Sequence, residues 1–380
     1  MSSIGPTEIP PEVGGESRVI EKPRTERVRP MSRSDLPRVT ELYRRVFGNT
    51  GSNSRDFLER VFFEPPWRDA SLPSLTYEDQ SGQIIGCLGV MPRQMKFHGE
   101  AIRAAVGHHF MIDPFRRDAR AAVELTRKFL RGSQDLSLAE GDESTRRIWE
   151  FLGGQVCLLY SFCWTRPLRP ARYALSVLNR RGLPPAAGLP LKPVCQAVDA
   201  TLQIVPLHGF RIQQPRVLGD DLDTVTMLAF LSAFANGRSL QPVYDFNSLD
   251  WLIDVLQTKR HRGTLHKVAV RTESGRPLGW YLYFLGTNGV AEVVQVGGNT
   301  DNMREVLNHL FYHAWRRGAV AATGPMDSNL CGVLSENDCM FNRPYNSWML
   351  AHSWDEKIIN AVNAGDAFLS RLEGEWWITS

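Results

Sequence analysis

The sequence has no Cys-x-x-Cys pair and no apolar run of membrane-spanning length. Its six cysteines are scattered along 380 residues, which argues against a zinc site or a disulfide scaffold and favours buried thiols in a reducing cytoplasm. A transmembrane helix needs roughly 18 or more consecutive apolar residues. The N-terminus also lacks the basic start and apolar segment of a secretory signal. We therefore expect a cytoplasmic protein with no membrane span and no metal.

The sequence also lacks a strong excess of charge of either sign. Lysine and arginine number 44, aspartate and glutamate 41, and the net charge is +3. Nucleic-acid-binding proteins usually carry concentrated positive charge, so no nucleic-acid partner is expected. The sequence shows no Ser-His-Asp arrangement and no nucleophilic-cysteine motif, and Cys157 and Cys163 stand among apolar residues, where thiols are inert. Covalent catalysis through serine or cysteine is therefore not indicated.

The length of the chain favours two domains, and 43% of its residues are hydrophobic, enough for two cores. Residues 1–25 are polar and rich in proline, glycine and glutamate, so we expect a disordered tail there. A proline-rich stretch that begins at Pro167 marks the domain boundary. The remaining parts are predicted to be a first domain at 26–169, a linker at 170–209, a second domain at 210–352 and a C-terminal helix or tail at 353–380.

Hydrophobic periodicity and turn residues predict one order of elements in both halves: two helices, three strands, a helix, a strand, a helix and two strands. The last two strands of each half, at 156–160 and 162–166 and at 339–341 and 347–351, are expected to close their own half. The halves share little residue identity, so the repeat is one of pattern. The predicted fold class is α+β, with two α/β domains that each hold a mixed, mainly antiparallel twisted sheet flanked by helices. Within the linker, we expect a short helix at 191–200.

An arginine-rich turn stands between a strand and a helix of the first half. The strand ends at Asp113-Pro114, and the helix that follows has apolar residues at helical spacing. The turn holds Arg116, Arg117 and Arg120, with small residues between and after them. Free N–H groups at a helix N-terminus, small side chains and arginines together suit a phosphate group. The turn is therefore a predicted anion-binding site, with a solvated arginine cluster as the alternative.

The order of elements resembles the GNAT superfamily of acyl-CoA-dependent N-acyltransferases. The segment RVRPMSRSDLPRVTELYRRVF is similar to the family's first strand and helix, FMIDPFRRDARAAVELTRKFL to its acyl-CoA motif, and DESTRRIWEFLGG to its late helix. The resemblance covers roughly residues 26–166 by motif and roughly 210–350 by topology alone. In that family the strand's backbone binds the pantetheine arm of the cofactor, and the N–H groups of the turn hold its pyrophosphate.

The resemblance implies acetyl-CoA or another acyl-CoA as co-substrate, and a small-molecule, sugar or peptide amine as acceptor. The residues it places against the cofactor lie on the strand and the turn: Phe110, Met111, Ile112, Arg116, Arg117, Asp118, Ala119, Arg120, Ala121 and Ala122. The sequence departs from the family pattern at two points. Arg120 or Ala119 stands where the motif's first glycine is usual, and Trp149 stands where a tyrosine usually protonates the leaving thiolate. An indole N–H cannot act as that acid at neutral pH.

Direct attack of an amine on a thioester needs a base for the amine proton and an acid near the sulfur. His108 and His109 lie on the central strand, and strand alternation predicts that they face opposite sides of the sheet, so at most one faces the reaction. A histidine packed under a helix is the alternative for either one. Glu140, after the next strand, is a further candidate base, whereas Asp142 suits a helix N-cap. Tyr160 is the nearest hydroxyl by topology, which makes it the candidate acid.

Two other functions are consistent with the resemblance. A Fem-type transferase would take an aminoacyl group from tRNA and would need a basic groove, which the balanced charge disfavours. A GNAT fold without catalysis would use the cleft between the domains for binding, which the departures at Arg120 and Trp149 favour. The corresponding turn of the second half, GGNTDNM, has no arginine, and its glycines leave only a weak anion site open. The final segment LEGEWWITS, with Glu373 and Glu375 beside Trp376-Trp377, is expected to be a docked C-terminus or to line an acceptor pocket.

Overall fold

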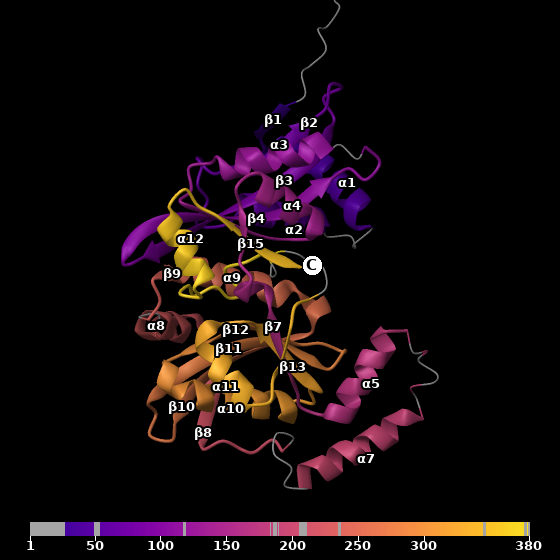
Figure 1. The fold of residues 1–380 in the computed structure, drawn as a ribbon, viewed down its shortest axis with the longest axis vertical. Helices are drawn as coiled ribbons and strands as arrows, with labels where there is room; N and C mark the ends of the chain where they lie inside the picture. Colours follow the sequence, from indigo (N-terminus) through magenta and orange to yellow (C-terminus); the bar gives the residue numbers. More distant parts are fainter. Residues whose placement is uncertain are drawn as a thin grey trace, which may run out of the picture.

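Two sheets, one above the other in Figure 1, make up most of this computed structural model. The described residues are 27–48, 54–116, 119–182, 184, 188, 190–204, 211–234, 237–344, 347–375 and 378. Three parts of the sequence-based predictions lie outside them: the expected disordered tail at 1–25, Arg117 and Asp118 of the turn, and Trp376-Trp377 near the C-terminus.

The first sheet contains eight strands, with β1, β2, β3, β4, β5, β15 and β6 in that order and β9 paired to β3. All its neighbours are antiparallel except β4 and β5. The strands are β1 (Arg27–Pro30), β2 (Leu75–Glu78), β3 (Ile84–Phe97), β4 (Glu100–Ile112), β5 (Leu136–Gly141), β6 (Gln155–Val156), β9 (Leu240–Pro242) and β15 (Trp348–His352). The helices of the same segment of the chain are α1 (Leu36–Phe47), α2 (Ser54–Phe63), α3 (Ala119–Leu130) and α4 (Glu143–Phe151).

The second sheet contains seven strands in the order β14, β7, β13, β12, β11, β10 and β8, and only β12 and β13 are parallel. The strands are β7 (Cys163–Pro167), β8 (Val217–Asp221), β10 (Thr264–Thr272), β11 (Pro277–Leu285), β12 (Val290–Gly298), β13 (Ala321–Pro325) and β14 (Met340–Asn342). The helices that accompany it are α8 (Thr224–Phe234), α9 (Phe246–Thr258), α10 (Met303–Arg316) and α11 (Cys331–Glu336), whereas α12 (Glu356–Asn363) lies against β9 of the first sheet. The predicted α+β class with two mixed, mainly antiparallel sheets is confirmed.

Local sequence signals explain where the helices begin and which face they bury. Asp142 caps α4 by accepting the Thr145 N–H at 2.8 Å, as its sequence position predicts. Asp245 caps α9 in the same way through the Ser248 N–H at 2.7 Å. In α10 the apolar residues at spacings of three and four, including Val306 and Leu310, are fully buried. Capping residues and apolar spacing within each segment therefore account for the formation of these three helices.

Each half of the chain places strands in the sheet that the other half mainly forms, which corrects the expectation that the last strands close their own half. The strand expected at 162–166 is β7, and it lies in the second sheet between β13 and β14. The strand expected at 347–351 is β15, and it lies in the first sheet between β5 and β6. A strand pattern shows which residues alternate, but it does not specify which sheet edge they will join. Each sheet is therefore built from both halves of the chain.

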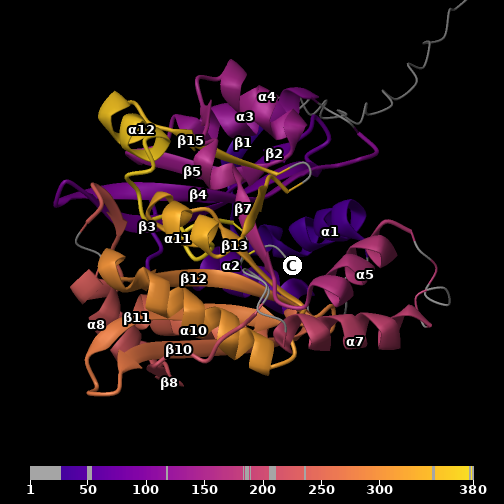
Figure 2. The same ribbon diagram turned by 60° about the horizontal axis from the view of Figure 1, so that its bottom comes forward.

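A helical hairpin occupies the predicted linker and stands apart from both sheets in two views (Figures 1 and 2). Its helices are α5 (Pro170–Arg180) and α7 (Leu191–Ile204). The expected short helix at 191–200 is thus present as part of α7, whereas α5 was not expected. Buried Asp199 joins the two helices, because its carboxylate accepts the Ala171 N–H at 2.8 Å and the Arg172 Nε–H at 3.0 Å.

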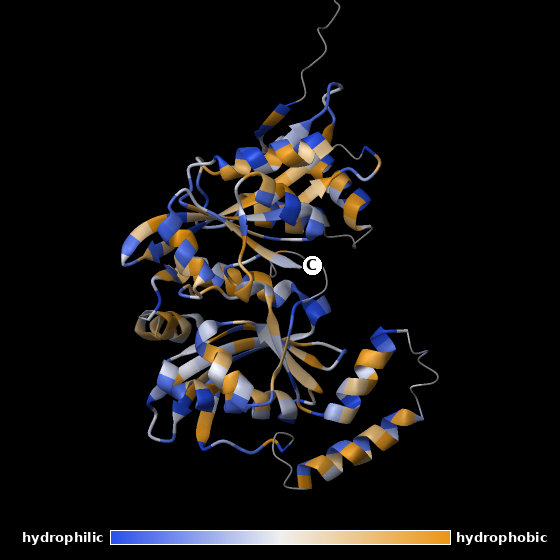
Figure 3. Ribbon diagram, in the orientation of Figure 1, coloured by the Kyte–Doolittle hydropathy of each residue, from blue (hydrophilic) through white to orange (hydrophobic). Residues whose placement is uncertain are grey.

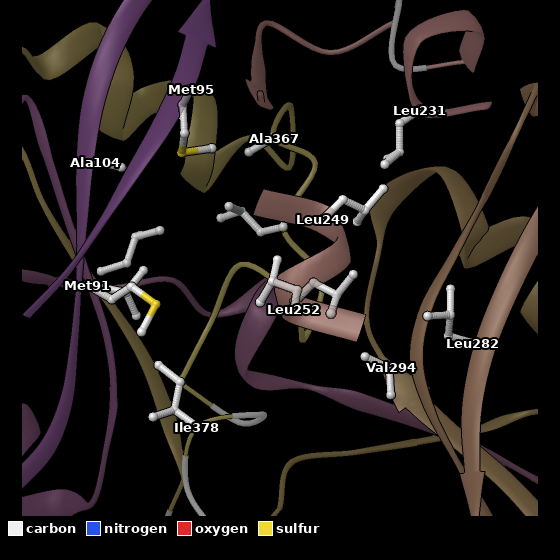
Figure 4. Packing of buried hydrophobic residues seen from close by; sticks show 14 of the residues in the cluster. Met91, Met95, Ala104, Leu231, Leu249, Leu252, Leu282, Val294, Ala367 and Ile378 are labelled. Carbon is white, nitrogen blue, oxygen red and sulfur yellow. The ribbon is translucent and has the colours of Figure 1, made fainter. Parts of the chain in front are cut away.

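The two sheets share one large hydrophobic core. Figure 4 shows Leu249 and Leu252 of α9 lying between strands of the two sheets, with Met91 on one side and Leu282 on the other. Ile378 from the C-terminal tail packs into the same cluster. Because this core has contributions from both halves, neither half buries its apolar surface alone. In the part of the chain that the structure describes, no helix is long and apolar enough to span a bilayer.

Candidate active site

An opening forms in the first sheet where its only two parallel strands separate. Strands β4 and β5 pair from Ala104 to Gly107 and from Leu136 to Ala139. Both strands continue beyond this point, β4 to Ile112 and β5 to Gly141, without pairing to each other. Backbone groups that lose a strand partner need another hydrogen-bonding partner. Beyond the point where β4 and β5 separate, another group must therefore supply hydrogen bonds to their backbones.

The carboxyl group of Glu375, from the C-terminal tail, occupies this opening. Its Oε1 accepts the backbone N–H of His109 on β4 at 3.0 Å. It also accepts the backbone N–H of Glu140 on β5. The carboxyl of Glu140 itself lies beside the tail, because a Cβ added to Gly374 would stand 2.8 Å from its Oε1. The tail thus bridges the two strands at the point where they part.

Desolvation of the partly buried Glu375 carboxyl, together with the nearby Glu140 carboxylate, raises the pKa of Glu375 to about 8. The two backbone N–H groups act in the opposite direction, because they stabilise the ionised form. A carboxyl group with a pKa near neutrality is suited to accept and return a proton at working pH. The sequence showed Glu375 only as a tail residue, and its one local signal is an acidic side chain beside two tryptophans.

A β-bulge brings the rings of His108 and His109 together, which corrects the expectation that they face opposite sides of the sheet. The register between β3 and β4 shifts there, so that Gly89 faces His108 and Cys87 faces Met111. His109 has φ 45°, outside the strand region. The two Nδ1 atoms lie 2.9 Å apart, and both rings contact Phe62 of α2, at centroid distances of 5.1 and 5.8 Å. The extra residue of the bulge breaks the two-residue alternation on which the expectation rested.

Burial lowers the pKa of both histidines, well below the usual value for His108 and to about 3 for His109. Both rings are therefore neutral at pH 7, so one Nδ1–H donates to the other Nδ1. Lys259 adds to the effect on His109, and burial also lowers the pKa of Lys259 to about 7. A neutral imidazole with so low a pKa is a weak base. The better placed base in this opening is Glu375.

Tyr160 contacts the same tail, but at a residue further from its end. Its hydroxyl donates to the Ala367 carbonyl at 2.6 Å and accepts the Ala367 N–H at 3.2 Å. Burial raises the pKa of Tyr160 above its usual value. Trp149, which the sequence comparison set at the position of an acid, is buried against Phe129 at 6.0 Å between ring centroids. The structure thus brings His108, His109 and Glu140 to the opening, and it places the Tyr160 hydroxyl on the tail backbone at Ala367.

Further hydrogen bonds hold the tail between the sheets. The Arg371 N–H donates to the Val294 carbonyl of β12 at 3.1 Å. The buried Arg93 guanidinium of β3 donates to the Leu372 carbonyl at 2.7 Å. Glu373 accepts the Ser370 N–H at 2.6 Å and the Tyr244 hydroxyl. The expectation of a docked C-terminus therefore holds for the described part of the tail, and this docking positions Glu375.

The predicted anion-binding turn leads directly from this opening. Met111 is buried, Phe110 and Ile112 are partly buried, and α3 begins at Ala119, which is exposed. Ala121 and Ala122 pack inward. The start of a twelve-residue helix with small residues in its first turn is the kind of position at which backbone N–H groups bind anions.

The described arginines of this turn contact carboxylates. Arg116 lies 3.1 Å from Asp79, and Arg120 lies 3.0 Å from Glu124 in the same helix. Asp113 at the strand end pairs with Arg45 of α1 at 2.8 Å. The two described arginines of the turn therefore have carboxylate neighbours, which an anion would have to compete with. Within the described residues, no cluster of three or more metal-ligating side chains occurs.

The equivalent turn of the second half borders a pocket of about 180 Å³. Gly297 and Gly298 at the end of β12 line it, together with Asn299 and Thr300. Arg238 also lines it, but this guanidinium pairs with Asp327. The pocket is thus lined by glycines and by a guanidinium whose charge is already paired with a carboxylate. The weak anion site of the second half stays a prediction.

No protein-family model matches this sequence, and no curated protein matches it. Solved structures do match its fold. A conserved protein of unknown function from Enterococcus faecalis, described as a probable N-acyltransferase, has a TM-score of 0.58 at 13% identity, with 87% of this chain and 72% of that chain covered. A GCN5-related N-acetyltransferase from Anabaena variabilis has a TM-score of 0.56 at 12% identity, with 86% and 72% covered. One from Kribbella flavida has a TM-score of 0.53 at 12% identity, with 87% and 71% covered.

Proposed function

Since the chain has the fold of the GCN5-related N-acetyltransferases, we propose that it transfers an acyl group from an acyl-CoA to an amine. The observation that carries this proposal is the Glu375 carboxyl at the point where β4 and β5 separate, held there by the His109 backbone N–H. A proton acceptor with a pKa of about 8 stands there beside a strand that runs into a turn suited to phosphate.

The proposed cofactor path begins at the turn and follows the strand back to Glu375. The pyrophosphate would lie at the N-terminus of α3, against the residues from Arg116 to Ala122. The pantetheine arm would follow the edge of β4 at Phe110–Ile112, which pairs with β3 on its other side. Its thioester would then reach the opening that Glu375 occupies. Acetyl-CoA is the simplest member of this substrate class, and acyl chain length is part of the test.

The proposed reaction is direct attack of the amine on the thioester carbonyl. The C–N bond forms, the C–S bond breaks, and the Glu375 carboxylate accepts the proton that the amine loses. The CoA leaves as a thiolate, which takes up a proton from water, and the protonated Glu375 returns its proton to solvent before the next turnover. The neighbouring Glu140 carboxylate helps to keep the pKa of Glu375 high. His109 is a positioning residue, because its backbone N–H holds the carboxyl in place.

Two measurements test this proposal. Calorimetry with acetyl-CoA and longer acyl-CoAs measures binding, and a thiol reagent measures CoA release with a panel of small-molecule, sugar and peptide amines. The sequence-based role of Arg117 predicts that Arg117→Glu weakens acyl-CoA binding about tenfold, the scale of one charge-assisted phosphate contact. The matched control is Lys128→Glu at the far end of the same helix. If no acyl-CoA binds, or if no amine stimulates CoA release, the proposed function is wrong.

A GNAT fold that binds acyl-CoA without catalysis is the second candidate. It is favoured by the buried Trp149, which cannot protonate a thiolate, and by the carboxylate partners of Arg116 and Arg120. It predicts acyl-CoA binding without CoA release for every amine. The Fem-type alternative predicts instead that aminoacyl-tRNA binds and acyl-CoA does not. Calorimetry therefore separates it from the other two functions, and the CoA-release assay separates those two from each other.

A further inference from the structure

The helical hairpin of α5 and α7 exposes aliphatic side chains at its outer end. Leu191 and Val194 of α7 are 42% and 58% exposed, and Leu178 of α5 is 50% exposed. Val198, one turn further along α7, is 44% exposed. Leu191, Val194 and Val198 recur at spacings of three and four, so they form one stripe along the helix. Figure 3 shows apolar bands along α7, on the side of the molecule away from the sheets.

The same end of the hairpin is positively charged. Arg180 and Arg181 end α5, Lys192 begins α7, and all three are exposed. Residues 169–204 carry five basic side chains and one acidic side chain, a net charge of +4, whereas the whole chain carries +3. The rest of the chain is therefore slightly acidic. The one acidic side chain of residues 169–204, Asp199, is buried between the two helices, so it does not offset the positive charge of the hairpin's outer end.

We propose that this hairpin tip docks the protein on the surface of an anionic lipid bilayer. An exposed aliphatic stripe bordered by cations matches the two layers of such a surface, with acyl chains below and negative headgroups above. The tip is defined here as Leu178, Arg180, Arg181, Leu191, Lys192 and Val194. Neither helix spans the bilayer, and the aliphatic side chains reach only its interfacial region.

Charge disfavours a second copy of the chain as the occupant of this surface. Two-fold pairing of identical tips would place Arg180, Arg181 and Lys192 of one copy near the same cations of the other. A bilayer that contains anionic lipid supplies the opposite charge together with an apolar layer. Adjacent exposed aliphatic side chains, rather than single ones, are what mark an interaction surface.

Co-sedimentation of the full chain with vesicles tests the proposal. We expect binding to vesicles of equal parts phosphatidylcholine and phosphatidylserine, no binding to pure phosphatidylcholine, and weaker binding at high salt. The double variant Arg180→Glu/Arg181→Glu should lower the apparent affinity by about tenfold or more, since each cation near such a surface contributes about fivefold. The variant Leu191→Asp/Val194→Asp should also lose binding.

Matched controls separate the tip from the rest of the surface. Val225→Asp replaces an aliphatic residue of α8 that is 65% exposed, and Arg276→Glu reverses an exposed charge in the turn between β10 and β11. Both should bind vesicles as the native chain does. Where the aspartate pair disturbs folding, Leu191→Ser/Val194→Ser replaces it, with thermal unfolding as the check.

Several results would overturn the proposal. One is the absence of binding to the anionic vesicles, and another is binding that the tip variants leave unchanged. Equal binding to both lipid compositions would remove the role of the cations. Gel filtration that shows a dimer, lost in Leu191→Asp/Val194→Asp, together with no vesicle binding, would assign the surface to a second copy instead. None of these results depends on acyl-CoA turnover.

Discussion

The carboxyl group of Glu375 accepts the backbone N–H of His109 at 3.0 Å, although 266 residues separate the two in the chain. The contact joins the C-terminal tail to the bulge of β4, and it sets the tail carboxyl at the parting of two strands. Because the donor is a backbone group, the contact is independent of which side chain residue 109 carries. It depends on the bulge and on the tail being held between the sheets.

The first prediction is that Glu375→Gln lowers kcat by about 100-fold or more with little change in acyl-CoA affinity. Glutamine keeps an oxygen that can accept the His109 N–H, but it cannot take up the amine proton. The measurement is CoA release with the acceptor that the amine panel identifies. Glu273→Gln, in the exposed turn between β10 and β11, is the control. Near-normal kcat in Glu375→Gln would place the base elsewhere.

The second prediction concerns the pH dependence of that reaction. Only ionised Glu375 can accept a proton, so kcat/KM should rise with pH up to about 8, the pKa that burial gives this group. Lys259 also titrates nearby, with a pKa of about 7. The residual activity of Glu375→Gln therefore serves as the reference, and it should lack the rise centred near pH 8. A rise of the same size in the variant would assign the pH dependence to another group.

The third prediction is that Glu375 makes the protein less stable as the pH rises from about 4.5 to about 8. In this window the carboxyl ionises in the unfolded chain but stays protonated in the folded one, so the folded chain binds more protons. Its contribution to the free energy of unfolding is complete below about 4.5 and is lost by about 8. Urea unfolding should show that the free energy of unfolding of Glu375→Gln increases relative to that of the native chain as the pH rises across this window. A stability difference that is independent of pH would contradict the raised pKa.

The fourth prediction is that Gly89→Ala destabilises the fold by about 1–3 kcal/mol, the usual cost of overpacking a buried site. A Cβ on Gly89 would stand 2.2 Å from Cε1 of His108, which is fully buried. The free energy of unfolding in urea is the measurement. Gly332→Ala is the control, because nothing lies within 4 Å of its Cβ position and its φ is ordinary. Equal stability of the two variants would show that the His108 ring can move aside.

The fifth prediction is that residues 1–169 expressed alone give a poorly soluble product. This fragment lacks β15, which pairs with both β5 and β6, and it carries β7 without its partners β13 and β14. It also exposes the half of the shared core that α9 covers. Co-expression with residues 170–380 should restore solubility, as gel filtration would show. A soluble, monomeric fragment that binds acyl-CoA would count against this dependence.

The sequence by itself determined the elements whose signals are local. Helical spacing located α10, an aspartate cap located the start of α4, and the strand that ends at Asp113 was recognisable together with the helix that begins at Ala119. These features depend on residues a few positions apart, where side-chain direction and capping chemistry act. The same local order of elements was enough to indicate the fold.

Only the tertiary structure decided the composition of the candidate site. The strand exchange of β7 and β15 depends on which sheet edge is open after the whole chain has folded. The bulge at His109 depends on the register between β3 and β4, which an alternating pattern does not reveal. Glu375 has a raised pKa because folding sets its carboxyl beside Glu140 and the backbone of β4, and a sequence pattern does not encode contacts between such distant segments.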